Sequence, residues 1–132
     1  MMRRKILFFL VVLTVILTAA CSAQPANNLQ KDISVDQAHA MYPDGAFFLD
    51  VRTPEEWKEV HIPSSTLIPL NELPTRLSEA PKDKNIIVVC RSGNRSQQGR
   101  DILLNAGWTQ ATSMSGGIRD WLAKGYPTEK GQ

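Results

Sequence analysis

The segment from Ile86 to Gly107 constrains the fold more than any other part of this 132-residue chain. It begins with four consecutive β-branched residues, Ile86 to Val89, which are typical of a short strand buried on both faces of a sheet. After a polar loop, Ile102, Leu103 and Ala106 recur at the spacing of one apolar helix face. This order predicts an α/β domain with a mostly parallel sheet, whose strand ends at the polar loop.

The loop carries a cysteine among cations. It reads Cys90, Arg91, Ser92, Gly93, Asn94, Arg95 and Ser96. Helix N-termini and nearby cations lower the pKa of a thiol and so favour the nucleophilic thiolate. Arg91 and Arg95 supply two positive charges, and Gly93 permits a tight turn in which successive amides face inward around an anion. A buried, inert cysteine is the alternative, but the polar and cationic surroundings favour a nucleophile that attacks or carries a small anion.

The spacing between cysteine and arginine separates two chemistries. Four residues lie between Cys90 and Arg95. Cysteine phosphatases and the related arsenate reductases have a similar loop with five intervening residues, which makes room for a tetrahedral oxyanion. In this chain that later position is Ser96. The shorter loop resembles that of the rhodanese family of sulfurtransferases, whose cysteine carries a terminal sulfur as a persulfide.

Two further stretches resemble the same family. They are Leu49 to Trp57 with His61 to Pro63 as the amino-terminal signature, and Gly116, Gly117, Trp121 and Gly125 to Pro127 as the carboxy-terminal one. Val60 and Ser64 stand where the family usually has glycine, and both positions concern the turn at His61. The resemblance spans nearly the whole predicted domain. It implies a single rhodanese-like α/β domain with a mostly parallel central sheet flanked by helices.

The resemblance also implies a reaction. Cys90 would take the outer sulfur of a small anionic donor such as thiosulfate and pass it to a thiophilic acceptor, either cyanide or a thiol. Amides of the loop from Arg91 to Ser96 would stabilise the persulfide anion, and Arg91 and Arg95 would bind the sulfonate of the donor. No cofactor and no metal is implied. A cysteine-dependent phosphatase or arsenate reductase, and a non-catalytic rhodanese-like module that binds a partner or senses oxidants, are the alternatives.

Charged residues near the predicted site favour structural roles. Asp50 and Arg52 end a second predicted strand, Ala46 to Arg52, at the same edge of the sheet as the loop. We interpret them as an ion pair that braces the loop, with a direct substrate role as the alternative. His61 has no second His or Cys at ligand spacing, so we interpret it as a turn and packing residue.

The remaining elements follow from caps and turns. Capping patterns predict helices after Ser34 and after Thr53. Further expected elements are strands at Thr66 to Pro69 and Ala111 to Met114, a helix over Asn71 to Ala80 and a helix over Ile118 to Lys124.

The first 21 residues have the features of an export signal. Three basic residues, Arg3 to Lys5, precede a continuous apolar run from Ile6 to Ala20 that is too short for a stable transmembrane helix. Leu17 to Cys21 resembles a bacterial lipobox, so we expect a lipid anchor on Cys21 and a place in the periplasm or cell envelope. Ordinary cleavage to a soluble periplasmic protein, or a retained membrane anchor, are the alternatives.

Removal of the export signal would determine the limits, the charge and the thiol content of the mature chain. Residues 22–31 are expected to be a flexible tether and residues 32–130 the domain. Without Arg3 to Lys5 the chain has 12 basic and 13 acidic residues, and nothing indicates nucleic-acid binding. With Cys21 lipidated or removed, Cys90 is the only thiol and no intramolecular disulfide can form. No apolar stripe is left over once the core is assigned, so we expect a monomer.

Overall fold

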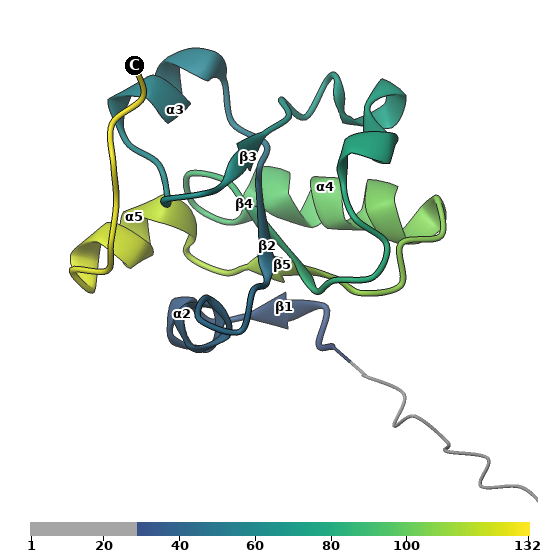
Figure 1. Ribbon diagram of the computed structural model, residues 1–132, viewed down its shortest axis with the longest axis horizontal. Helices are drawn as coiled ribbons and strands as arrows, with labels where there is room; N and C mark the ends of the chain where they lie inside the picture. The colour runs from purple at the N-terminus through teal and green to yellow at the C-terminus, as the bar shows by residue number, and fades with distance from the viewer. Residues whose placement is uncertain (1–28) are drawn as a thin grey trace, which may run out of the picture.

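The computed structural model describes residues 29–132, and the predicted signal peptide, Cys21 and most of the predicted tether lie outside this part (Figure 1). A single five-stranded sheet forms the centre of this part of the chain. Its strands are β1 (Asp32–Ile33), β2 (Phe47–Asp50), β3 (Thr66–Leu67), β4 (Ile86–Val89) and β5 (Ala111–Met114). They lie in the order β1-β5-β4-β2-β3, and every pairing is parallel. The predicted α/β fold with a parallel sheet is confirmed.

Helices cover both faces of the sheet (Figure 1). The helices are α2 (Val35–Met41), α3 (Pro54–Glu59), α4 (Asn94–Asn105) and α5 (Gly117–Ala123). Leu103 of α4 packs with Leu49 and Val88 on one face. On the other face, Ala38 of α2 and Trp121 of α5 belong to the cluster that contains Phe48 and Ile87. The sheet therefore separates two apolar layers.

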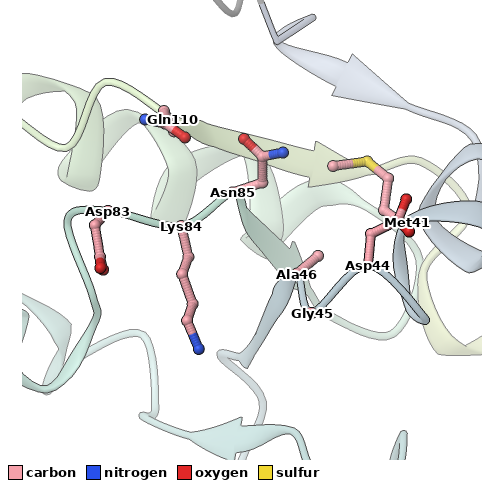
Figure 2. A pocket seen from close by; sticks show the side chains of 8 residues that line it. All are labelled: Met41, Asp44, Gly45, Ala46, Asp83, Lys84, Asn85 and Gln110. Carbon is pink, nitrogen blue, oxygen red and sulfur yellow. The ribbon is translucent and has the colours of Figure 1, made fainter.

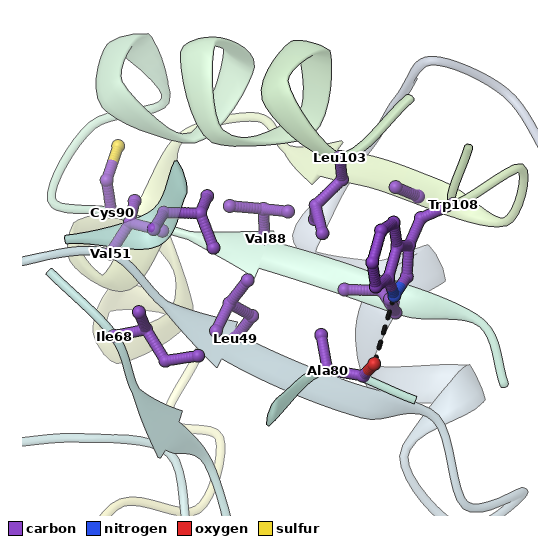
Figure 3. Packing of buried hydrophobic residues seen from close by; sticks show 11 residues of the cluster. Leu49, Val51, Ile68, Ala80, Val88, Cys90, Leu103 and Trp108 are labelled. Atoms are coloured by element: carbon purple, nitrogen blue, oxygen red, sulfur yellow. Dashed lines mark hydrogen bonds between the residues drawn. The ribbon is translucent and has the colours of Figure 1, made fainter. Parts of the chain in front are cut away.

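Strand β4 lies at the centre of these layers, as its unbroken apolar run predicts. All four of its residues are buried, and Val88 faces the α4 layer while Ile87 and Val89 face the α2 and α5 layer. Figure 3 shows Val88 packed among Leu49 and Leu103, with Cys90 at the end of the strand. Because both faces are covered, the strand fixes the position of the loop that follows it.

The two predicted capping boxes are present. Ser34 Oγ accepts the N–H of Gln37 at 3.1 Å, and Gln37 Oε1 accepts the N–H of Ser34 at 2.9 Å. Thr53 and Glu56 make the same reciprocal pair at the start of α3. Local side-chain chemistry thus sets where these two helices begin.

The helix predicted over Asn71 to Ala80 is wrong. Two 3₁₀ turns, Leu73–Thr75 and Leu77–Glu79, replace it, and their hydrogen bonds join residues three apart, as from Arg76 N–H to the Leu73 carbonyl. Pro74 lies in the first turn, where its missing N–H is tolerated. The helix is interrupted at Arg76, whose φ of −120° and ψ of 17° depart from helical values, and Ala80 before Pro81 is extended. The side chain of Arg76 joins the two turns through Glu72 and Glu79.

Strand β1 was not predicted, since two residues are too short for a hydrophobic pattern to show. It pairs with β5, and the Lys31 carbonyl accepts the N–H of Ser113 at 2.9 Å. Thr112 Oγ1 donates to the Gln30 carbonyl at 2.6 Å. The last residues of the predicted tether therefore lie hydrogen-bonded against the sheet.

Within residues 29–132, no helix is both long enough and apolar enough to cross a membrane.

Candidate active site

The thiol of Cys90 lies in a cage of polar groups at the carboxyl end of β4. The residue is 1% exposed, and Figure 3 shows its sulfur pointing toward the loop that leads into α4. The N–H of Gly93 donates to Sγ at 3.0 Å. Gly93 has a φ of +112°, and a Cβ there would lie 3.3 Å from the backbone nitrogen of Gly116. The loop can take this course because the position has no side chain.

A pair of buried hydroxyls completes the cage. The Cys90 thiol donates to Ser96 Oγ at 3.4 Å, and Ser96 Oγ donates to the Gly93 carbonyl at 2.9 Å. Ser96 Oγ also lies 2.8 Å from Ser113 Oγ on β5. Both serines are fully buried. The sequence indicated Ser96 through its place in the loop, but it gave no signal for Ser113.

These contacts set the acidity of the thiol. Burial by itself would raise the pKa of Cys90. When the thiol is ionised, hydrogen bonds to the sulfur from the Ser96 hydroxyl and from the amides of Ser96, Gly93 and Ser92 stabilise the anion and outweigh burial, so the pKa of Cys90 lies below its ordinary value. The amino end of α4 begins four residues after Cys90 and adds its positive dipole end. These donors favour the thiolate relative to the thiol.

The start of α5 closes directly on the loop. The N–H of Ile118 donates to the Cys90 carbonyl at 2.8 Å, and the N–H of Arg119 donates to the Arg91 carbonyl at 3.2 Å. Gly117 has a φ of +60°, and a Cβ there would lie 2.4 Å from the Cys90 carbonyl oxygen. The sequence indicated Gly116 and Gly117 only as part of the carboxy-terminal signature. In the structure, the absence of a side chain at Gly117 allows the start of α5 to approach the backbone of the loop.

The two loop arginines have different surroundings. Arg95 forms a bidentate ion pair with Glu56 of α3, with both N–O distances at 2.8 Å. The hydrogen bond from Arg95 lowers the pKa of Glu56 to about 2, against the desolvation of its partly buried carboxylate. Arg91 is exposed and makes no ion pair within residues 29–132. Arg91 is therefore the loop cation that faces solvent, while Arg95 joins the loop to α3.

Asp50 and Arg52 lie beside the loop as a buried ion pair. Arg52 Nε donates to Asp50 Oδ1 at 2.9 Å, and Arg52 Nη2 donates to Asp50 Oδ2 at 2.6 Å. The same Nη2 donates to the Val60 carbonyl at 2.7 Å. Asp50 is 1% exposed and Arg52 3%. The pair connects the end of β2 to the end of α3, and so supports the wall next to Arg95.

A pocket of about 250 Å³ adjoins the loop. Its lining is rich in arginine, with apolar patches from α5: it comprises Arg52, Glu56, Glu59, Val60, Arg91, Ile118, Arg119 and Leu122. Ser92 and Asn94 are exposed on the outer side of the loop. The pocket is large enough for a small anion, and Arg91, which has no ion-pair partner within residues 29–132, brings a positive charge to its lining.

A larger pocket, of about 490 Å³, lies at the opposite end of the sheet (Figure 2). It is bordered by Asp44 and Gly45 before β2, by Lys84 and Asn85 before β4, and by Gln110 before β5. In Figure 2 the labelled side chains do not converge on one point. Within residues 29–132, no three His, Cys, Asp or Glu side chains are grouped closely enough to hold a metal ion.

Of the six predicted loop residues that follow Cys90, four act on the sulfur. Ser92, Gly93 and Ser96 do so through amides or a hydroxyl, and Arg95 through its charge, whereas Arg91 and Asn94 are exposed. A buried thiol with a lowered pKa, held among amide donors, can attack a small electrophile as the thiolate.

Comparison with known proteins agrees with this geometry. A family model described as "Rhodanese-like domain" matches residues 34–124. A sulfurtransferase of Allochromatium vinosum is 36% identical over 84 residues, covering 64% of this chain and 78% of the relative. A thiosulfate sulfurtransferase of Pseudomonas syringae pv. syringae is 35% identical over 99 residues, covering 75% and 92%. The crystal structure of a rhodanese-related protein from Thermoplasma volcanium superimposes with a TM-score of 0.71 at 30% identity, covering 76% of this chain and 98% of that one.

Proposed function

Because this chain belongs to the rhodanese-like domain family, we propose that it is a sulfurtransferase that carries sulfur on Cys90 as a persulfide. Its relatives in Allochromatium vinosum and Pseudomonas syringae are named as sulfurtransferases, which supports sulfur transfer in general. The single observation that supports the proposal most strongly is the cage around Cys90. Its sulfur is buried and accepts the Gly93 amide at 3.0 Å, as an anionic nucleophile requires.

The first step loads the enzyme. The Cys90 thiolate attacks the outer sulfur of thiosulfate or a similar donor, and a new S–S bond forms. The S–S bond of the donor breaks, and its electron pair leaves with sulfite. The product is a Cys90 persulfide anion, so the charge stays at the site. The amides that favour the thiolate also favour this anion, because both are negatively charged sulfur.

The second step transfers the sulfur from Cys90 to the acceptor. A thiophilic acceptor, either cyanide or a thiolate, attacks the terminal sulfur of the persulfide. The S–S bond breaks, and its electron pair returns to Cys90 as thiolate. With cyanide the product is thiocyanate. No oxidant, reductant or cofactor is consumed, and donor and acceptor need never be bound together, so we expect ping-pong kinetics.

The surroundings of the loop suggest how the donor binds. Arg91 is exposed at the pocket and has no carboxylate partner in the described part of the chain. We therefore propose that its guanidinium binds the sulfonate of the donor. Arg95 can share that anion only if it loosens its pair with Glu56. Arg95 therefore contributes mainly its positive charge near the sulfur and its ion pair with Glu56 of α3.

Steady-state kinetics with thiosulfate and cyanide test the proposal. Parallel double-reciprocal lines and complete loss of turnover in Cys90→Ser are expected. The same preparations are then given an aryl phosphate and arsenate. Cys90-dependent hydrolysis of the phosphate, or reduction of arsenate, without sulfur transfer would replace the proposal by the phosphatase or arsenate reductase alternative. Inactivity toward all three substrates would favour a non-catalytic module.

We also propose that the protein is exported and lipid-anchored at Cys21 in the cell envelope. The basic residues Arg3 to Lys5, the apolar run and the lipobox-like end support this. Metabolic labelling with a fatty acid is expected to mark the wild type and not Cys21→Ser. Equal labelling of the two, or soluble periplasmic wild type, would contradict the anchor.

We further propose that the mature protein is a monomer. Leu122, 43% exposed, is the one large hydrophobic side chain that is exposed in residues 29–132, too little for a stable apolar interface. Analytical ultracentrifugation is expected to give a monomer mass, and a concentration-dependent dimer would contradict it.

A further inference from the structure

Ser113 is a buried hydroxyl that the reaction scheme above does not use. It lies on β5, next to the loop, and is 0% exposed. Within residues 29–132 its Oγ has one hydrogen-bond partner, Ser96 Oγ at 2.8 Å. Its backbone is separately fixed, because the N–H donates to the Lys31 carbonyl at 2.9 Å. The side chain therefore points at the cysteine cage through one contact.

The number of hydrogens decides the direction of that contact. A buried hydroxyl that has no acceptor loses the stabilisation of its hydrogen bond to water, so its O–H must donate where an acceptor exists. Ser96 Oγ is the acceptor that Ser113 has, and so Ser113 donates to Ser96. The single hydrogen of Ser96 is then left for either the Gly93 carbonyl at 2.9 Å or the Cys90 sulfur at 3.4 Å.

The two ionisation states of Cys90 use this arrangement differently. In the thiol state, the S–H donates to Ser96 Oγ, which itself donates to the Gly93 carbonyl. In the thiolate state, the S–H is gone and Ser96 turns its hydrogen to the sulfur. Ser96 Oγ then receives a hydrogen bond from Ser113 alone. Deleting the Ser113 hydroxyl therefore removes the last donor to Ser96 in the thiolate state, but only one of two in the thiol state.

We propose that Ser113 is a positioning residue that selectively favours the thiolate form of Cys90 by donating to Ser96. This deepens the proposed function, on which it rests, since the thiolate is the attacking species. Ser113 touches neither the sulfur nor the substrate in this account. Its effect reaches Cys90 through the orientation and polarisation of the Ser96 hydroxyl.

The charged groups near the thiol lie on other elements. They are Arg91 of the loop, Arg95 of α4, Glu56 of α3, Asp50 and Arg52 at the end of β2, and Arg119 of α5. Strand β5 carries no ionisable side chain. Changing Ser113 to alanine consequently leaves every charge in place, and a shift in the ionisation of Cys90 can be attributed to the hydroxyl.

The test measures the rate of alkylation of Cys90 by iodoacetamide across a pH series, in the full chain. Trypsin releases Cys90 in the peptide from Asn85 to Arg91, which separates it from Cys21 in mass spectrometry. Ser113→Ala is expected to move the midpoint of the profile to higher pH and to lower the rate at neutral pH about threefold. The plateau at high pH is expected to stay unchanged, because access to the sulfur does not change.

Thr112→Val is the matched control. Thr112 is a fully buried hydroxyl on the same strand, but it donates to the Gln30 carbonyl, away from the loop. Its profile is expected to match the wild type, and Ser113→Thr is expected to restore the wild-type midpoint. In a Ser96→Ala background, Ser113→Ala is expected to add no further shift.

A Ser113→Ala midpoint equal to that of the wild type would overturn the proposal, and so would an equal shift in Thr112→Val. Failure of the proposed function is distinguishable, because a wild type that takes no sulfur from thiosulfate can still show the Ser113-dependent shift. If Ser113→Ala does not fold, the Ser113→Thr and Ser113→Cys profiles decide. Ser113→Cys, a much weaker donor, is expected to shift the midpoint as alanine would, and a wild-type profile for Ser113→Cys would overturn the proposal.

Discussion

The two ends of the parallel sheet form pockets of opposite character. The amino end has the larger one, about 490 Å³, bordered by mixed charges such as Asp44 and Lys84 that do not converge. The carboxyl end has about half that volume, but its loop contains a buried thiol that accepts an inward amide. The comparison indicates that reactivity depends on hydrogen-bond donors that converge on a nucleophile, and not on the volume of the pocket.

The difference follows from chain direction. In parallel strands every carboxyl end points to the same edge, and the helices that follow begin there with free N–H groups. The loop amides, the start of α4 and the first amides of α5 therefore meet at Cys90. At the amino edge the incoming loops bring polar side chains that do not converge, and the buried Oδ1 of Asn85 has no hydrogen-bond partner within residues 29–132. If the carboxyl end depends on this convergence, substitutions there are expected to have larger effects than substitutions at the amino end.

The largest effect is expected at the ion pair that supports the carboxyl end. Arg52→Ala leaves the carboxylate of Asp50 buried without its partner, and the free energy of unfolding is expected to fall by about 3–5 kcal/mol. Chemical denaturation measures it. Arg76→Ala removes two largely exposed ion pairs, with Glu72 and Glu79, and is expected to change stability little. Equal losses in the two variants would contradict the role given to burial.

Next in size is the contact between α5 and the loop. Gly117→Ala places a Cβ 2.4 Å from the Cys90 carbonyl oxygen, so the loop must shift. A displacement of about 1 Å at a reacting group can cost on the order of 100-fold, and we expect kcat/KM to fall by about that factor. Gly45→Ala at the amino end has the same kind of left-handed φ, +80°, with open space around it. If Gly45→Ala lost as much activity, backbone strain alone would explain both.

A smaller effect is expected at Glu56. Its pKa falls from 4.5 to about 2 because Arg95 donates to it, so the charged carboxylate stabilises the fold. That contribution is fully present above pH 4.5 and is lost as the pH falls toward about 2. Because both partners are partly exposed, we expect about 1 kcal/mol or less.

The measurement for Glu56 is the pH dependence of unfolding. Glu56→Gln is expected to remove this part of the wild-type acid sensitivity, while Glu59→Gln, on the same helix and without an ion pair within residues 29–132, is expected to keep it. A Glu56→Gln profile parallel to the wild type would show that the pair with Arg95 contributes nothing in solution.

The smallest effect is expected at the amino end. Lys84→Ala and Asp44→Asn alter the larger pocket without reaching the loop. Sulfur transfer, measured as kcat/KM for thiosulfate, is expected to stay within about twofold of the wild type, as for most surface substitutions. A tenfold fall in either variant would mean that the two ends are coupled, and the comparison would no longer hold.

Local patterns in the sequence predicted the features that depend on neighbouring residues. The unbroken run at Ile86 to Val89 predicted β4, and Thr53 with Glu56 predicted the start of α3. The helix predicted over Asn71 to Ala80 was wrong, because the backbone of Arg76 departs from helical values and divides the segment into two 3₁₀ turns.

The contacts between distant residues could not be predicted. Ser113 lies 17 residues from Ser96, and nothing in the sequence of β5 distinguishes a hydroxyl that reaches the Cys90 loop from one that does not. The sequence predicted that Arg95 binds substrate. In the structure its guanidinium instead forms an ion pair with Glu56, 39 residues away. Tertiary folding decides such partners.

Intact-protein mass spectrometry of the wild type, Cys90→Ser and Cys21→Ser, before and after thiosulfate, tests the central claim most directly. The account predicts that the wild type and Cys21→Ser each gain one sulfur atom, that cyanide removes it, and that Cys90→Ser gains none. A wild type that gains no sulfur, or a Cys90→Ser variant that gains as much, would contradict it.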